Sequence, residues 1–201
     1  MMGAEPKGEY AMFYHASQTP HIETLEPRVS NENVPRIFFS DKRENVLVYL
    51  SNAVERTCRR NGFVHAGKWQ KWATYGFTPD GLLHFSEYYA HALEDTYAGA
   101  QGYIYSVEPS DAITRFEKIR NCFFAETPQR IAACEPVPDA LEALLKAERE
   151  GKIVITRYEE LSPRRLEWIR QTTFDEYRNA VDAPDYRFFL KTKYPFLESE
   201  E

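Results

Sequence analysis

Residues 36–49 have the sequence RIFFSDKRENVLVY, and the short run FYHAS stands upstream of them at residues 13–17. The apolar and aromatic letters of RIFFS predict a β-strand. Ser40 and Asp41 follow as typical helix N-cap residues, so a helix that carries Tyr49 is expected directly after the strand. Such a strand-to-helix corner can bring two aromatic rings to opposite sides of one slot for a flat ligand.

The predicted helix covers residues 42–60, where apolar side chains recur at helical spacing. Asp41 and Glu44 have the spacing of a capping box, with Asp in place of Ser or Thr. Asn61 and Gly62 are expected to end the helix, because both residue types tolerate the left-handed conformation of a helix C-terminus.

Length and composition bound the remaining possibilities. The 201 residues, 43% of them apolar and 14% aromatic, predict one globular domain, with or without a helical appendage. The formal net charge of -6 disfavours general nucleic-acid binding. Three cysteines without a CxxC pair indicate free thiols in a reducing compartment and no zinc site. No long apolar run or signal-like N-terminus is present, so a cytoplasmic protein without a membrane span is expected.

The chain divides by character into a sheet-rich region, residues 1–137, and a helical C-terminal extension, residues 138–201, packed on the same domain. Strands are predicted within residues 11–17, 36–40, 102–111 and 121–131, and a tight turn at residues 78–81. Helices are predicted within residues 138–152, 162–181 and 182–196, with Ser162 as an N-cap and Pro163 at the first helical position. Residues 152–160 fit a strand or an extended link, and the flanks of the tight turn fit strand or short helix.

These two motifs resemble the ADP-ribosyltransferases of the diphtheria-toxin and poly-ADP-ribose-polymerase type. That family has a strand with a Tyr/Trp-His-Gly-Ser pattern, then an Ile-Tyr-Phe-Ala-Asp strand with a second Tyr eleven residues on. Without a gap, IFFSD at residues 37–41 matches this strand, and Tyr49 matches the second Tyr. The resemblance implies an α+β fold, a split mixed β-sandwich that binds NAD in a cleft, here with a helical C-terminal extension.

The resemblance also implies roles for individual residues. His15 would bind a ribose and contribute to catalysis, and Ala16 and Ser17 would hold the nicotinamide amide and its ribose. Phe38 and Tyr49 would sandwich the nicotinamide ring. Ser40, which stands at the same corner, is carried over as a further cofactor-binding residue, and no metal is implied.

The sequence departs from the family pattern at several positions. Ala16 replaces the family Gly, Phe38 lacks the hydroxyl of the first Tyr, and Val46 replaces a family Ser that bonds nicotinamide. For the family's catalytic Glu, aligning the late strand by its end gives Glu126. Aligning it by its start puts Asn121 there and leaves no carboxylate, and a third choice is Glu108.

The function implied is cleavage of the nicotinamide–ribose bond of NAD and transfer of ADP-ribose to an acceptor, which is a protein, a nucleic acid or a small molecule. A carboxylate such as Glu126 would stabilise the oxocarbenium-like charge and position the acceptor. Two alternatives stay open. One is a catalytically weak module of the same fold that binds NAD or ADP-ribose, and the other is an enzyme like the RNA 2'-phosphotransferases, which use NAD to remove a phosphate.

Other side chains carry weaker indications. Trp69, Trp72 and Tyr75 fit either a cleft mouth or the core. His84 and His91, two helical turns apart in sequence, lack a third partner for a metal site. No P-loop or GxGxxG pattern is present, and the sequence leaves the oligomeric state open.

Overall fold

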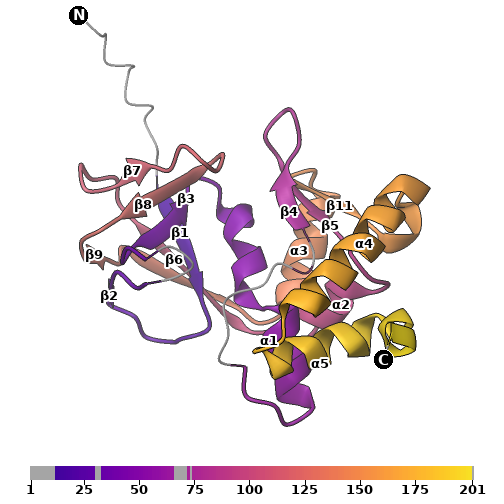
Figure 1. Ribbon diagram of the computed structural model, residues 1–201. Helices are drawn as coiled ribbons and strands as arrows, with labels where there is room; N and C mark the ends of the chain where they lie inside the picture. Colours follow the sequence, from indigo (N-terminus) through magenta and orange to yellow (C-terminus); the bar gives the residue numbers. More distant parts are fainter. Residues whose placement is uncertain (1–11, 30–32, 66–71, 73, 201) are drawn as a thin grey trace, which may run out of the picture.

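A computed structural model of the chain describes residues 12–29, 33–65, 72 and 74–200. The fold is α+β, with two main sheets and a set of helices. Figure 1 shows the larger sheet on the left, the smaller sheet and the C-terminal helices on the right, and the helical segment η1 between them. The two sheets therefore lie on either side of the segment that follows the IFFS strand.

The larger sheet is antiparallel and has six strands in the order β10-β6-β1-β3-β8-β7. Its strands are β1 (Phe13–Ser17), β3 (Ile37–Ser40), β6 (Gly102–Val107), β7 (Thr114–Arg115), β8 (Cys122–Ala125) and β10 (Ala133–Val137). The strands predicted within residues 11–17, 36–40, 102–111 and 121–131 are thus confirmed. The edge strand β10 was not predicted, because Pro136 and its exposed polar neighbours resemble a loop, and proline is tolerated at sheet edges.

The smaller sheet has the order β11-β5-β4, with β11 parallel to β5 and β5 antiparallel to β4. Its strands are β4 (Thr74–Phe77), β5 (Leu83–Ser86) and β11 (Ile153–Thr156). The tight turn at residues 78–81 is confirmed, since the Gly81 N–H donates to the Thr78 carbonyl at 2.9 Å and Gly81 has a φ of 90°. Because β11 belongs to the C-terminal segment, residues 138–201 contribute a strand as well as helices.

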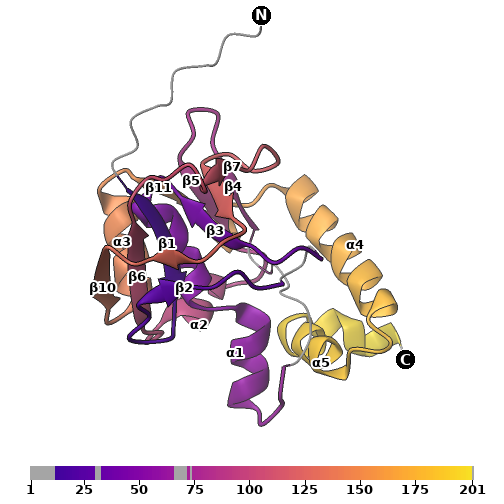
Figure 2. The same ribbon diagram turned by 90° about the vertical axis from the view of Figure 1, so that its left-hand side faces the viewer.

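A short pair, β2 (Thr24–Leu25) with β9 (Gln129–Arg130), lies over one face of the larger sheet. Figure 2 shows β2 and the connecting loops in front of the strands β1 and β3, with α4 and α5 to the right. The apolar side chains under this cover form a core of their own, which includes Phe13, Phe39 and Phe123.

The helix predicted over residues 42–60 is two helices, so that prediction is corrected. The structure has the 3-10 helix η1 (Arg43–Leu50), an extended break at Ser51 and Asn52, and then α1 (Ala53–Arg60). Asn52 ends the first helix and caps the second, because its side chain accepts the Glu55 N–H at 3.0 Å. The length of a short helix that is buried between two sheets is set by its packing rather than by its cap.

The capping box of Asp41 and Glu44 is also wrong. Lys42 occupies the N-cap position of η1 and provides no side-chain cap. The Ser40 hydroxyl instead accepts the Lys42 N–H at 3.1 Å, so it closes a turn between β3 and η1.

Three of the remaining helices lie within the predicted ranges 138–152, 162–181 and 182–196, whereas residues 92–97 fitted strand or short helix in the sequence and the short helices at 158–160 and 195–200 were not predicted. The remaining helices are α2 (Ala92–Tyr97), α3 (Ala140–Arg149), η2 (Tyr158–Glu160), α4 (Pro163–Asn179), α5 (Pro184–Lys193) and η3 (Pro195–Glu200). Ser162 caps α4 by accepting the Arg165 N–H at 3.3 Å, with Pro163 at the first position, and both predictions are confirmed. No helix of the described ranges has the length and apolar character that spanning a bilayer requires.

Two cores join these elements. One lies between the sheets and contains Ala16, the apolar side chains of η1, Phe85, and the inner faces of α2 and α3. The other joins α1, α2, α4, α5 and η3 around Trp72. The C-terminal helices are therefore packed against the smaller sheet's side of the molecule through α1 and α2, as Figure 1 shows.

Candidate functional site

The strands β1 and β3 are neighbours in the sheet but stay paired for only one position. Their register contains the single pair Tyr14–Ser40, whereas β1 and β6 share five pairs and β3 and β8 share four. Beyond Tyr14 the ladder between β1 and β3 is not continued. The sheet is therefore split on the side of Ala16 and Ser17, which are two of the residues that the resemblance singles out.

The His15 side chain bridges the two strands where they part. Its Nδ1 lies 2.9 Å from the Phe38 carbonyl oxygen, and because a carbonyl only accepts, Nδ1 carries the proton and donates. Burial lowers the pKa of His15, the hydrogen bond to Phe38 opposes this, and the positive charge of Arg28 lowers the pKa further. His15 is thus a neutral imidazole near pH 7, with Nε2 left as an acceptor.

The rings of the motif point in different directions. The His15 ring meets the edge of Phe39 at a centroid distance of 6.1 Å, on the side of the core that contains Phe13. Ala16 lies in the other core, with η1. The Phe38 ring meets Phe116 edge to face at 5.4 Å. Strand alternation therefore spreads the predicted cofactor-binding residues over the split rather than on one flat face.

Tyr49 lies near the Ser17 end of β1. It is 47% exposed at the end of η1, next to the fully buried Leu50. The Leu50 carbonyl accepts the Gln18 Nε2–H at 2.6 Å, which ties this end of η1 to the chain just after β1. A half-exposed tyrosine on a buried, anchored helix presents a ring surface on which a planar ligand can stack.

The two serines of the prediction serve local turns. The Ser17 hydroxyl accepts the Thr19 N–H at 3.1 Å. The Ser40 hydroxyl accepts from Lys42 and also from the Asn45 side chain, at 3.2 Å, and Ser40 is buried. Ser40 therefore supports the corner between β3 and η1 from inside.

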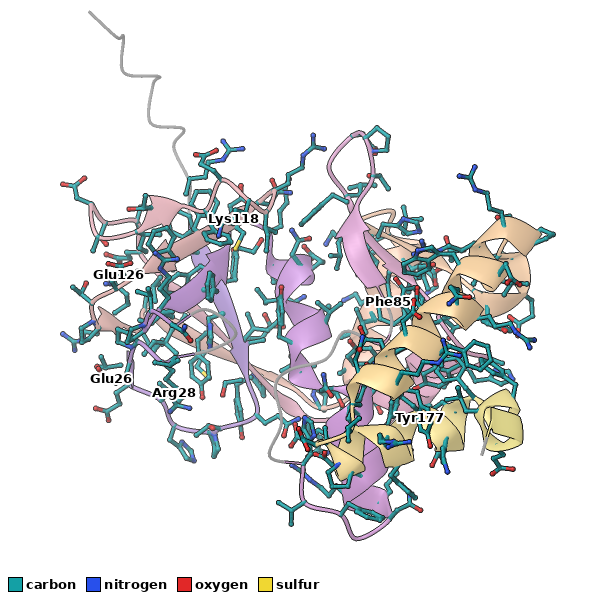
Figure 3. The ribbon with its side chains drawn as sticks, in the orientation of Figure 1. Glu26, Arg28, Phe85, Lys118, Glu126 and Tyr177 are labelled. Carbon is teal, nitrogen blue, oxygen red and sulfur yellow. The ribbon has the colours of Figure 1, made fainter. Side chains whose placement is uncertain are left out.

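Glu126 lies directly after β8 and forms an ion pair with Arg36, with Nε–Oε1 at 3.0 Å. The Arg36 guanidinium also covers the Phe124 ring at 4.3 Å. Figure 3 shows Glu126 at the outer corner of the larger sheet, away from η1. The structure therefore brings His15, Ala16, Phe38 and Tyr49 to one part of the sheet and leaves Glu126 at another.

The other two positions considered for the acidic residue, Asn121 and Glu108, lie in a loop contact and at an exposed strand end. Asn121 adopts a left-handed φ of 54°, and its side-chain amide donates to the Gly81 carbonyl at 3.1 Å. It thereby links the loop before β8 to the turn between β4 and β5. Glu108 is exposed just past the end of β6.

Two carboxylates near η1 were missed by the sequence analysis. Glu135 is paired through Ile104 to Ala16 across the sheet, and Arg43 of η1 donates to it, with Nε–Oε2 at 2.9 Å. The hydrogen bond from Arg43 lowers the pKa of Glu135. No sequence signal could have found this pair, because it depends on the unpredicted strand β10.

The second missed carboxylate is Asp41. Its Oδ1 is buried and has no hydrogen-bond partner among the described residues. Burial raises the pKa of Asp41, against the lowering effect of Lys42. Its place immediately after β3 was visible in the sequence, where it was assigned to a helix cap.

The weaker candidates are also placed. Trp72 is buried among Tyr194, Phe189 and Tyr88, so it belongs to the core, while Trp69 falls outside the described residues. His91 has a left-handed φ and precedes α2. Within the described ranges, no group of three or more His, Cys, Asp or Glu side chains is arranged to hold a metal ion.

A pocket of about 370 Å³ is present, but it lies on the outer face of the smaller sheet, beside α4, and not at the split between β1 and β3. The split has the residues that the sequence motif predicts, whereas the hollow of about 370 Å³ lies at the pocket. Comparison of the chain with protein-family models, curated proteins and solved structures finds no match.

Proposed function

We propose that this chain is an ADP-ribosyltransferase-like protein that binds NAD where β1 and β3 part. The observation that carries the proposal is the split itself: two strands with the predicted motifs pair once and then separate, with the His15 ring between them. Sheet strands are normally hydrogen-bonded along their length. In the proposed complex, the ligand reaches the backbone of β1 and β3 at this split.

The arrangement of layers is compatible with the split mixed β-sandwich that we propose for the fold. One sheet is antiparallel, the other has a parallel and an antiparallel pair, and η1 fills the space between them. The helices α4 and α5 then form the C-terminal extension on the outside of the smaller sheet's half of the molecule (Figure 1).

The proposed contacts follow from the chemistry of the residues. The neutral His15 accepts a ribose hydroxyl at Nε2 while its Nδ1–H holds the Phe38 carbonyl. Tyr49 and Phe38 contact the nicotinamide ring, and the small Ala16 lets it approach β1. Arg28, whose positive charge acts on His15, is near enough to the split to attract the NAD diphosphate.

In the proposed reaction the bond between ribose C1 and the nicotinamide nitrogen breaks, and nicotinamide leaves with the bonding electron pair. The acceptor atom then forms a bond to C1 and loses its proton to a base or to water. A carboxylate near C1 stabilises the developing cation and takes this proton. Glu126 is the predicted carboxylate for this role.

The second candidate function is a module that binds NAD or ADP-ribose with little or no transfer. The position of Glu126 favours it, because an ion pair with Arg36 at the outer corner of the sheet keeps this carboxylate away from η1. Binding and cleavage are therefore tested separately.

The test measures NAD binding by calorimetry and nicotinamide release by chromatography for the wild type, His15→Ala, Tyr49→Ala and Glu126→Gln. Trp168→Ala is the matched control, since Trp168 is 45% exposed on α4 and Tyr49 is 47% exposed on η1. We expect His15→Ala and Tyr49→Ala to abolish NAD binding and Trp168→Ala to retain it. If His15→Ala does not fold, the loss of NAD binding in Tyr49→Ala tests the proposed site by itself.

Release of nicotinamide by the wild type but not by Glu126→Gln supports the transferase, with a loss of about 10² to 10⁴ in rate. Binding without release supports the module. Absence of NAD binding by the wild type contradicts both, and equal binding by Tyr49→Ala contradicts the proposed site.

A further inference from the structure

The pocket on the outer face of the smaller sheet is separate from the split between β1 and β3. Its floor comes from β4, β5 and β11, and its wall comes from residues 160–162 and the first turn of α4. Strand alternation explains the floor: Phe85 and Ile155 point into the core with η1, so His84 and Thr156 point outward.

The floor holds a polar side chain that lacks a protein partner. Ser86 is only 9% exposed, it lines the pocket, and its hydroxyl makes no hydrogen bond to any residue that the structure describes. Beside it, His84 Nε2 and the Thr156 hydroxyl are 2.8 Å apart, so a polar ligand meets a prepared hydrogen-bonding surface.

The wall holds a fixed cation. The Arg165 guanidinium lies 4.1 Å from the Trp168 ring centroid and 5.3 Å from that of Tyr88, and it donates to the Tyr88 hydroxyl at 3.0 Å. Among the described residues it forms no ion pair with a carboxylate. Because a guanidinium has five N–H donors, an Arg held in this way can bind a ligand carboxylate with two of them.

The same wall holds one carboxylate, Glu160. Its Oε2 accepts the Arg157 N–H at 2.8 Å, and no described cation pairs with it. The lining thus has one positive and one negative side chain, and a simple anion would meet repulsion from Glu160. Apolar surface comes from Leu161; Phe77 also lines the pocket, but it pairs with Leu83 and packs against the core between the sheets.

The floor is kept open by a glycine. A Cβ built on Gly76 meets no atom within 4 Å, although Gly76 pairs with His84 in the sheet and lines the pocket. Glycine weakens a strand interior, so its use here is explained by the space that it leaves for a ligand. The volume of about 370 Å³ is within the range of small-molecule sites.

We propose that this pocket binds a small zwitterion of the α-amino-acid type. Arg165 binds the carboxylate, Glu160 binds the ammonium group, and the Ser86 hydroxyl provides a further hydrogen bond. Leu161 contacts a compact apolar side chain. The proposal does not depend on NAD binding, because the two sites share no residue.

The test titrates the full chain with each standard L-amino acid by calorimetry, together with the deaminated acid and the decarboxylated amine of any amino acid that binds. The key variant is Gly76→Val, which adds a side chain on the pocket floor at a position where a Cβ meets no atom within 4 Å and which suits a strand. Its thermal unfolding should match that of the wild type. Arg165→Gln and Glu160→Gln each remove one charge, and Gln at position 160 still accepts the Arg157 N–H.

We expect at least one amino acid to bind the wild type, binding to disappear in Gly76→Val, and each charge-removing variant to weaken it about tenfold or more. The deaminated acid and the amine should be weaker by a similar factor. The proposal is overturned if no amino acid binds, if Gly76→Val binds as the wild type does, or if the deaminated acid binds as tightly as the amino acid.

Discussion

The split between β1 and β3 and the pocket beside α4 have similar chemistry but different origins. Each combines an imidazole in a hydrogen bond, a half-exposed aromatic ring and an arginine: His15, Tyr49 and Arg28 in one, His84, Trp168 and Arg165 in the other. The first set stems from two motifs within residues 13–49. The second joins His84 of β5 to Arg165 and Trp168 of α4, which lie far from β5 in the sequence, so a motif marks only the sites that the chain builds locally.

The largest expected effect is on the free energy of unfolding, and it distinguishes a core residue of η1 from a residue of η1 that is proposed to contact the ligand. Leu50→Ala should lower the free energy of unfolding by about 2–5 kcal/mol, because Leu50 is fully buried. Tyr49→Ala should change it by no more than about 0.5 kcal/mol, since the ring is half exposed. Urea titrations measure both. A large loss in Tyr49→Ala would make its ring part of the core and remove the basis for a stacking role.

The next effect compares two strand glycines, one in each region. A Cβ on Gly102 would lie 2.5 Å from Leu50 Cδ2 and 2.9 Å from the Ser17 carbonyl oxygen, whereas a Cβ on Gly76 meets nothing. Gly102→Ala should therefore destabilise the protein by about 1–3 kcal/mol. Gly76→Ala should be neutral or stabilise it by about 0.4–1 kcal/mol.

Thermal and urea unfolding of the two alanine variants check this pair of expectations. The double variant Leu50→Ala/Gly102→Ala sharpens the comparison, because the shorter side chain at position 50 removes one of the two clashes. Its cost should be smaller than the sum of the two single costs. Strict additivity would show that Gly102 does not hold η1 against the sheet.

The third effect concerns pH and the buried imidazole of the split. The pKa of His15 is lowered in the folded state, so below about pH 6.5 the unfolded chain binds a proton that the folded chain does not. Stability contributed by neutral His15 is present above that pH and is lost as the pH falls toward the folded-state pKa. The slope reaches at most about 1.4 kcal/mol per pH unit.

Urea titrations of the wild type and His15→Gln between about pH 5 and 7 measure this slope. Asp41, whose pKa is raised by burial, acts with the opposite sign, since its contribution falls as the pH rises. We expect the wild type to lose more stability on acidification than His15→Gln does. Parallel curves would show that His15 is solvated and that the split is open at its position.

The smallest effect compares the helix caps of the two regions. Asn52 accepts the Glu55 N–H at 3.0 Å and Ser162 accepts the Arg165 N–H at 3.3 Å. Asn52→Ala and Ser162→Ala should each cost about 1 kcal/mol, with the shorter bond costing more. Chemical denaturation measures both. A null result for Asn52→Ala would mean that packing alone separates η1 from α1.

Part of this fold was predictable because some signals are local. The strands around His15 and Phe38, the turn at residues 78–81, and the cap of α4 at Ser162 all depend on residues close in sequence, and all are confirmed. The prediction of a single helix over residues 42–60 was wrong. The apolar spacing fits one long helix with an exposed face, but it fits equally well a short helix buried on most sides that is followed by a second helix.

The candidate site was predictable to a similar extent. Both His15 and Phe38 belong to the motif, but the hydrogen bond that joins them across 23 residues was not predicted. The ion pairs of Glu126 with Arg36 and of Glu135 with Arg43 join residues about 90 positions apart, which no spacing rule reaches. The role of Gly76 is likewise visible only once β5 and α4 are in place.

The sequence by itself determined the secondary structure of strongly patterned segments, because side-chain periodicity, caps and turn residues act over a few positions. Only the tertiary structure decided where β1 and β3 part, which carboxylates are paired, and where a pocket opens. These features depend on which strands are neighbours and on the packing of segments that are far apart in the chain. Many residues from different segments contribute to the free energy of that packing, so no single stretch of sequence determines it.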